Sequence, residues 1–398
     1  MIKRYKIISV LLTACLLTLF CGCAADTEGT NSAAEEEVAY TLPLLLPVSG
    51  EIRNLGEDAL WAAEYAVDEI NASGGIQGIP VKIELYDSQN SESQVKKYAK
   101  EIAENNRFFI GPIDSVGTAA EAEIISDTGT PNIAAYSYES LRLQAAPYGI
   151  SYMSDSTDDE LEAVREWKEL NPDIEKVAIV VTKGETAQME VSEVMKACLS
   201  ELNMSAEAVV EMDLKENEGL DAVAEALNAK VDGYVILARS EESIKFVSEV
   251  RKRGVTEGRR ITASFASNDF DMFQQNQTVM EGTYIWNKFD VAYQGEEWQK
   301  LLQAYRNDHD GQDPSTNITP DIYNAVYAWK RCMEDLKLGP EPEDLKAEKE
   351  KIAEWFAASP VINAIQGDYQ WLNGNKKGQF YYFQIDENGV PRSLNQGS

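Results

Sequence analysis

The segment from Asn54 to Asp87 constrains the fold more than any other part of the chain, and it reads NLGEDALWAAEYAVDEINASGGIQGIPVKIELYD. Asn54, with Glu57 three residues later, predicts a capped helix start. The apolar residues that follow recur at the spacing of one helical face: Leu60, Ala63, Val67 and Ile70. Gly74 and Gly75 predict the end of the helix, because glycine readily adopts the left-handed conformation that closes a helix.

Strand patterns flank this helix. One occupies Tyr40–Val48, and Val81, Ile83 and Leu85 alternate with other residues as a second strand would. This order of strand, glycine-containing loop, capped helix, GG-x-x-G turn and strand resembles the opening of the leucine/isoleucine/valine-type substrate-binding proteins of ABC transporters. An unrelated βαβ unit that ends its helix on glycine would show the same short motif.

The resemblance extends over residues 40–390. It implies a type I periplasmic-binding fold, which is an α/β fold of two doubly wound parallel-sheet lobes joined by a three-segment hinge. The length agrees, because the roughly 360 residues that follow the N-terminal segments exceed what one hydrophobic core usually organises.

The first 22 residues have the layout of an export signal. An apolar run at 7–20, too short to span and anchor in a membrane, follows three positive charges: Lys3, Arg4 and Lys6. The end of the run resembles a bacterial lipoprotein cleavage site, although Phe20 replaces the usual leucine. This resemblance implies a lipid on Cys23 and an extracytoplasmic location anchored to the cell membrane. Plain secretory cleavage near residues 24–25 is the alternative.

Residues 23–39 follow as the lipidated cysteine and an acidic tether, since DTEGTNSAAEEEV at 26–38 has too few large apolar groups to order itself. Removing the signal changes the formal net charge from −31 to −34. Charge of this sign excludes nucleic acid as a partner and repels anionic lipid, so the attached lipid would hold the protein at the membrane.

Residues that commonly carry catalysis are scarce. Beyond the signal region the cysteines are Cys198 and Cys332, which match neither a disulfide framework nor a zinc pattern; the resemblance implies that they lie on different lobes, unpaired. The single histidine, His309, is expected in an exposed loop. No nucleophile elbow, phosphate-binding loop or dinucleotide-binding fingerprint occurs, so the sequence predicts no enzyme, no cofactor and no metal.

The pattern of elements predicts two successive α/β lobes. Strands are expected at 40–48, 81–86, 108–111 and 131–135, then at 177–182, 206–212, 233–237, 260–265 and 380–385. Helices are expected at 54–73, 91–105, 117–128, 158–170, 185–202, 218–228, 240–254, 294–306, 319–338 and 342–358. The resemblance implies that lobe 1 comprises 40–148 plus 287–377 and lobe 2 comprises 149–286 plus 378–398, with crossovers near 147–152, 284–288 and 376–380.

Candidate ligand contacts in lobe 1 follow its predicted strands, because doubly wound sheets bind ligands beyond the carboxyl ends of their strands. The first loop holds Asp114, Ser115 and Thr118, and helix capping is the structural alternative for the last two. Family members place a serine against the carboxylate of the bound amino acid, and Ser115 matches that position. The next loop adds Tyr136, Ser137 and Tyr138. Arg53 lies in a further loop on the same edge of the sheet.

Lobe 2 departs from the family pattern. Amino-acid binders of the family supply an aromatic residue after the first strand of lobe 2 and an acidic residue after the 260–265 strand, where it holds the ligand ammonium. Thr186 occupies the first position and is not aromatic, and Phe265 occupies the second and is not acidic. An unpaired buried ammonium would cost several kcal/mol. Either the ligand therefore lacks an α-ammonium or an acid elsewhere supplies the charge: Asp114, Asp269 or Asp271.

Two further residues of lobe 2 are candidates. Arg239, after the 233–237 strand, would meet an anionic group or else lie in solvent at a helix start. Trp286 would form an aromatic wall with Tyr136, Tyr138 and Phe265, and core packing is the alternative.

Together these observations predict a monomeric extracytoplasmic lipoprotein that captures a small amino acid, organic acid or amide. The resemblance implies that it delivers this ligand to the permease subunits of an ABC importer. A sensor lipoprotein that signals to a receptor is the alternative, and an enzyme is a third interpretation that lacks a catalytic constellation.

Overall fold

The computed structural model describes residues 38–394, with gaps at 137–138, 154–155, 214–218, 265–274, 315, 373 and 378–379. The predicted signal at 1–22, Cys23 and the tether as far as residue 37 lie outside the described residues. Residues 38–398 form one compact unit. None of the described helices has the length and apolar character needed to cross a membrane.

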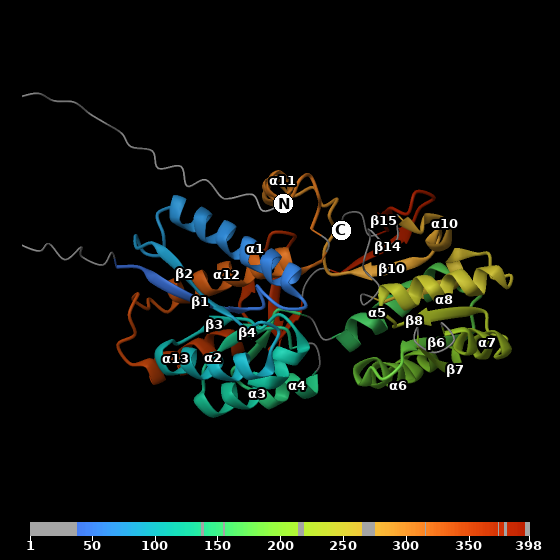
Figure 1. Ribbon diagram of the computed structural model, residues 1–398, viewed down its shortest axis with the longest axis horizontal. Helices are drawn as coiled ribbons and strands as arrows, with labels where there is room; N and C mark the ends of the chain where they lie inside the picture. The colour runs from blue at the N-terminus through green and yellow to red at the C-terminus, as the bar shows by residue number, and fades with distance from the viewer. Residues whose placement is uncertain are drawn as a thin grey trace, which may run out of the picture. The chain divides into compact units, whose positions relative to one another are not determined.

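Lobe 1 is built on a five-stranded parallel sheet with the order β2-β1-β3-β4-β5 (Figure 1). Its strands are β1 (Tyr40–Leu46), β2 (Val81–Asp87), β3 (Phe109–Ile110), β4 (Asn132–Ala134) and β5 (Gly149–Ser151). The helices between them are α1 (Arg53–Ala72), α2 (Glu92–Asn105), α3 (Ser115–Thr128) and α4 (Glu139–Ala145). Strand β5 and helix α4 were not predicted from the sequence.

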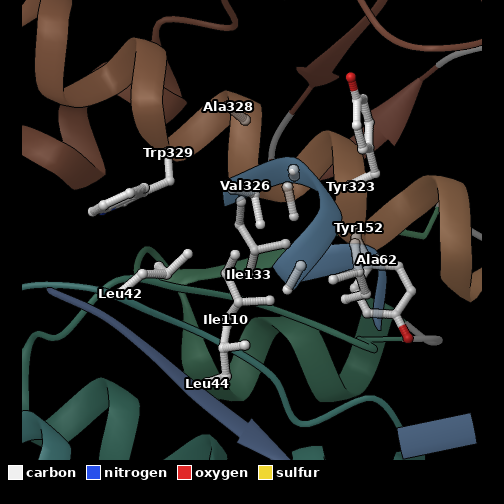
Figure 2. Packing of buried hydrophobic residues seen from close by; sticks show 14 of the residues in the cluster. Leu42, Leu44, Ala62, Ile110, Ile133, Tyr152, Tyr323, Val326, Ala328 and Trp329 are labelled. Atoms are coloured by element: carbon white, nitrogen blue, oxygen red, sulfur yellow. The ribbon is translucent and has the colours of Figure 1, made fainter. Parts of the chain in front are cut away.

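Apolar side chains on both faces of this sheet are buried. Leu44 and Ile110 point to the face covered by α1 and by the later helix α12 (Ile318–Asp335), as Figure 2 shows. Leu45 and Phe109, their neighbours in sequence, point to the face covered by α2, α3 and α4. Alternation between two buried faces is what a doubly wound sheet requires.

The start of α1 differs from the prediction. Its N-cap residue is Ile52, which makes no side-chain capping hydrogen bond. Asn54 lies inside the first helical turn, where it cannot take the non-helical conformation of a cap residue, so the predicted cap by Asn54 and Glu57 was wrong.

The end of α1 confirms the glycine stop. Gly74 and Gly75 have φ of +101° and +75°, and the Gly75 amide donates to the Ile70 carbonyl at 2.8 Å. A Cβ at Gly75 would lie 2.1 Å from the carbonyl oxygen of Ile79. A side chain therefore does not fit where the chain turns into β2.

Lobe 2 contains a seven-stranded sheet of order β15-β14-β10-β9-β8-β6-β7. Strand β14 runs antiparallel to β10, and β15 runs antiparallel to β14. Its strands are β6 (Lys176–Thr182), β7 (Ser205–Met212), β8 (Gly233–Ile236), β9 (Ile261–Ala263), β10 (Tyr284–Asn287), β14 (Tyr381–Ile385) and β15 (Pro391–Ser393). Its helices are α5 (Ser156–Leu170), α6 (Thr186–Glu201), α7 (Leu220–Asn228), α8 (Ser240–Lys252) and the short α10 (Gln277–Met280). The parallel part repeats the 2-1-3-4-5 order of lobe 1.

The segment between β10 and β14 completes lobe 1. Helices α11 (Glu296–Asp308), α12 and α13 (Leu345–Ala357) pack their apolar residues into the same cluster as β1 and α1. A small sheet of β11 (Val361–Ile362), β12 (Tyr369–Leu372) and β13 (Asn375–Lys377) joins this cluster. Tyr40 in β1 donates a hydrogen bond to the carbonyl of Leu338 at 2.7 Å, which ties the first strand to a residue 298 positions later.

The chain thus passes between the lobes three times, after β5, after β10 and after β13. Two of the proposed boundaries need correction. Residues 149–151 form β5 in the sheet of lobe 1 because they pair with β4, and Asn287 belongs to β10 in the sheet of lobe 2 because it pairs with β14. The first crossover therefore lies after Ser151, and the second lies at Lys288, between Asn287 and the lobe 1 core residue Phe289.

The two cysteines and the single histidine of the described residues can be compared with their predicted positions. Cys332 on α12 and Cys198 on α6 are buried and free, on different lobes, as predicted. His309 lies in a turn, as predicted, but it is only partly exposed. It follows the last residue of α11, its ring stacks on Tyr305 at a centroid distance of 3.8 Å, and 27% of its side chain is exposed.

Candidate functional site

The order of strands in lobe 1 reverses between β1 and β3, and in a doubly wound sheet a ligand crevice is expected at this position, where successive helices leave on opposite faces. At this edge the loop after β1 is tied to the end of β2. Ser49 Oγ donates to Asp87 Oδ2 at 2.6 Å, and the Ser49 amide lies 3.2 Å from Asp87 Oδ1. These bonds fix the backbone at one side of the crevice.

Helix α3 begins on the other side. Asp114 is its N-cap, and Asp114 Oδ1 accepts a hydrogen bond from the Gly117 amide at 2.8 Å. Asp114 thus takes the capping role that the sequence had offered to Ser115 and Thr118. Burial raises the pKa of Asp114, while the amides of Gly117 and Val116 act in the opposite direction.

Ser115 and Thr118 point in different directions from α3. Ser115 is exposed at the helix start. Thr118 is fully buried, and its hydroxyl lies 3.0 Å from the Asp114 carbonyl and 3.3 Å from the Ala135 carbonyl. The Thr118 hydroxyl therefore joins α3 to the loop after β4, and Ser115 is the one of this pair that faces outward.

Tyr136 packs inside lobe 1. Its side chain is 1% exposed, and its hydroxyl lies 3.1 Å from both Glu121 Oε1 and Asn132 Oδ1. Asn132 Nδ2 donates to Glu121 Oε1 at 2.6 Å and to the Gly111 carbonyl at 3.0 Å. Burial raises the pKa of Glu121 well above its ordinary value, while the hydrogen bonds from Asn132 and Tyr136 act in the opposite direction.

This Glu121 network joins the carboxyl ends of β3 and β4 to α3. It therefore positions the loop that carries Ser115 and the loop that leads into residues 137–138. Ser137 and Tyr138, the other predicted contacts of that second loop, lie outside the described residues.

In lobe 2, Trp286 takes the core-packing alternative. It is 1% exposed, its ring stacks on Phe380 at a centroid distance of 5.4 Å, and its Nε1 donates to Glu160 Oε2 at 2.8 Å. The predicted aromatic wall is absent among the described residues, because Tyr136 lies in the core of lobe 1 and Trp286 in the core of lobe 2. Phe265, Asp269 and Asp271 lie outside the described residues.

The remaining predicted residues lie at helix starts. Arg239 is exposed and forms an ion pair with Glu185, the N-cap residue of α6. Thr186 is the first residue of α6, and the described residues do not include its side chain. Arg53 begins α1, is exposed and lies 3.5 Å from Glu57. Arg239 thus takes the solvent-facing alternative, and Arg53 is likewise exposed.

A pocket of about 640 Å³ opens beside Ser115 and is lined from both lobes. Its volume falls within the range of small-molecule sites. The described lining residues are Glu92 of α2; Ser115, Val116, Ala119 and Ala120 of α3; Ser140, Leu141 and Gln144 of α4; and Gly184, Glu185 and Glu190 of lobe 2. Of the predicted side chains in the described part, Ser115 alone belongs to this lining.

The pocket contains acids that the sequence reasoning missed. Glu92, Glu185 and Glu190 line it, and no lysine or arginine is among its described lining residues. Glu92 is paired with Lys96, and Glu185 with Arg239. A positional signal existed, because these glutamates lie in or next to the first turns of helices that follow parallel strands, where doubly wound folds gather their ligand contacts.

The described residues contain no cluster of three or more histidine, cysteine, aspartate or glutamate side chains that would hold a metal ion.

Comparisons with known proteins agree with this architecture. A family model described as "Periplasmic binding protein" matches residues 39–389. The Leu/Ile/Val-binding protein BraC3 of Rhizobium johnstonii is 32% identical over 90 residues, which are 22% of this chain and 24% of that protein. The chain therefore aligns with about a quarter of the length of this curated relative.

Solved structures extend the similarity over nearly the whole fold. The branched-chain amino acid transporter substrate-binding protein LivJ of Streptococcus pneumoniae, in complex with isoleucine, has a TM-score of 0.70 at 16% identity and covers 89% of this chain and 97% of its own. A solute-binding protein of R. palustris in complex with benzoate has a TM-score of 0.69 at 17% identity, covering 89% and 95%. At these identities the similarity shows the fold.

Two doubly wound lobes, three crossovers and a pocket between strand-to-helix loops define the type I periplasmic-binding class. The chain belongs to the periplasmic binding protein family, and its relatives include Leu/Ile/Val-binding proteins. The resemblance found in the sequence is thereby confirmed. These relatives are binding proteins and not enzymes, and membership of the family implies an extracytoplasmic location.

Proposed function

We propose that this protein captures a small solute in the pocket between its lobes and delivers it to an ABC importer. The observation that carries the proposal is the pocket itself, since Ser115 of lobe 1 and Gly184, Glu185 and Glu190 of lobe 2 line the same cavity. A ligand that contacts both sides would favour the closed arrangement by its differential affinity for that state.

The proposed ligand is amino-acid-like, or else a small organic acid or amide. The isoleucine and benzoate complexes of two structural neighbours fit these classes. The Ser115 hydroxyl at the start of α3 would donate a hydrogen bond to a ligand carboxylate. Glu185 and Glu190 would accept hydrogen bonds from an amino group, which favours an amino acid over a plain carboxylate.

A thermal-shift screen of amino acids and small carboxylates tests this proposal on a chain that begins at Ala24, which retains the compact unit of residues 38–398. A true ligand stabilises the folded state by about 2.7 kcal/mol at a hundred times its dissociation constant, so the melting temperature rises with concentration. If no member of either class shifts the melting temperature, the proposed ligand class is wrong.

The anchoring proposal has its own test. We expect a lipid on Cys23 and, through it, attachment to the cell membrane beside the permease subunits. Cys23→Ala should release the protein from the membrane fraction, while a Cys21→Ala control should remain attached. A Cys23→Ala protein that stays in the membrane fraction would contradict the proposed anchor.

A further inference from the structure

Charged residues from all three crossovers converge at the hinge. The first crossover leads into Asp158 and Asp159 at the start of α5, the second contains Lys288, and the third begins with Lys376 and Lys377 at the end of β13. No single segment of the sequence brings these residues together. Their proximity results from the three crossings lying side by side.

Lys288 lies at the centre of this group. Its side chain is 5% exposed, and its Nζ is 3.4 Å from Asp159 Oδ2 and 5.8 Å from the centre of the Trp286 ring. Burial lowers the pKa of Lys288, while Asp159 and Asp321 both raise it. The ammonium therefore pairs with an acid of lobe 2 and lines the same small cavity as an acid of lobe 1, Asp321.

The lobe 1 side of the group is buried as well. Asp321 on α12 is 3% exposed and forms an ion pair with Lys376, whose Nζ lies 5.0 Å from the centre of the Tyr369 ring. Lys377 pairs with Asp158 and so links the third crossover to α5. Three lysines thus face three aspartates, and the group is balanced in charge.

A small polar cavity adjoins the group. It has a volume of about 20 Å³, which is room for one water molecule, and Lys288, Asp321 and Lys376 line it with Asn324 and Gln366. A buried charge tolerates little displacement in such surroundings, because water is too scarce to replace a partner that moves away.

We propose that Lys288 is a positioning residue whose ion pairing with Asp159 of lobe 2, beside Asp321 of lobe 1 in the shared cavity, sets the angle between the lobes in the unliganded protein. Rotation about the three crossovers would move Asp159 relative to Asp321, and Lys288 cannot follow both. Apolar packing lacks this dependence on direction, whereas a buried ion group favours one arrangement.

The test measures the distance between the lobes without any ligand, so its outcome is independent of the proposed function. Spin labels are attached at Ser126→Cys on α3 and Ala224→Cys on α7, both exposed, in a chain that begins at Ala24. The native thiols Cys198 and Cys332 are 3% and 0% exposed, and a mass corresponding to two labels verifies that they remain unmodified.

Lys288→Met keeps the length of the side chain and removes its charge, and Lys288→Arg restores the charge. We expect Lys288→Met to shift or broaden the inter-lobe distance distribution and Lys288→Arg to return it toward that of the parent. Lys300→Met is the matched control, because Lys300 pairs with Glu296 on the exposed surface of α11 and should leave the distribution unchanged.

Lys288→Met removes the cationic partner of Asp159. A second variant, Lys288→Met/Asp159→Asn, is therefore measured beside it, because this double substitution removes both charges of the pair. A shifted or broadened distribution in the folded double variant supports the proposal. A distribution identical to that of the parent in the folded double variant would overturn it, since packing alone would then set the angle.

Discussion

Glu121 of lobe 1 and Glu160 of lobe 2 are both buried, and the two acids differ in what they hold. Glu121 in lobe 1 binds Asn132 and Tyr136, all within one lobe and directly beneath the loops that flank Ser115. Glu160 in lobe 2 accepts the Trp286 N–H and lies beside Asp159 and Lys288 at the hinge. The comparison indicates that the buried acid of lobe 1 supports the loops of the pocket, whereas the buried acid of lobe 2 lies at the hinge between the lobes.

The largest effect is expected from Glu160→Gln. Burial raises the pKa of Glu160 to about 8, opposed by hydrogen bonds from Trp286 and Ser264. The folded protein therefore keeps a proton that the unfolded chain loses above pH 4.5, so this group lowers stability as pH rises from about 4.5 to about 8. The total is of order 4 kcal/mol, at 1.36 kcal/mol per pKa unit.

Glutamine does not ionise and retains an acceptor for Trp286. Denaturant unfolding at several pH values should show Glu160→Gln more stable than the parent at pH 8 and similar to it at pH 4.5. The same slope with pH in both proteins would mean that Glu160 is ionised in the fold.

Glu121→Leu should have the next largest effect. It leaves Asn132 and Tyr136 buried without their shared acceptor, which should destabilise the protein by about 2–3 kcal/mol at pH 4.5. Glu121→Gln is the matched control, because its carbonyl oxygen replaces Oε1. Equal unfolding midpoints for the leucine and glutamine variants would show that the network contributes no stability to lobe 1.

Ser115→Ala should weaken binding of the ligand found by screening by about 1–2 kcal/mol, the range for a hydrogen bond to a charged group. Stability should not change, because Asp114 and not Ser115 caps α3. Calorimetry with Ser126→Ala, an exposed serine on the same helix, provides the control. Unchanged affinity would show that the ligand does not contact Ser115.

Arg239→Ala should have the smallest effect. Arg239 and Glu185 form an exposed pair, and such pairs contribute about 0.2–1 kcal/mol to stability. The variant releases Glu185 from its partner at the edge of the pocket, so affinity for a ligand with an amino group should rise slightly. A large loss of stability would instead indicate that the pocket edge of lobe 2 is as firmly built as that of lobe 1.

Strong local patterns made most of the fold predictable. The stop at Gly74 and Gly75 follows from backbone geometry, and the long apolar strands β1 and β6 carry enough residues to be recognised. Strands such as β5 and β11 have three and two residues and form because neighbours in space complete them. Their short sequences carry no periodic signal.

The candidate site was harder to predict for a related reason. Ser115 was found because its loop follows a strand and resembles a family motif. Tyr136 and Trp286 were placed at the ligand because an aromatic residue has the same signal in a core and in a pocket. Their buried partners, Glu121 and Glu160, lie 15 and 126 positions away in the sequence. The local sequence around these two acids gave no sign of such pairing.

The hydrogen bond between Tyr40 and Leu338 has a consequence for the order of folding. During synthesis the first strand emerges almost 300 residues before its partner, and α12 must arrive before the core around β1 and α1 is complete. The sheet of lobe 2 is likewise incomplete until β14 has been synthesised, because β14 pairs with β10. Neither lobe can mature alone from the nascent N-terminus, so the chain remains unfinished until nearly its full length is available.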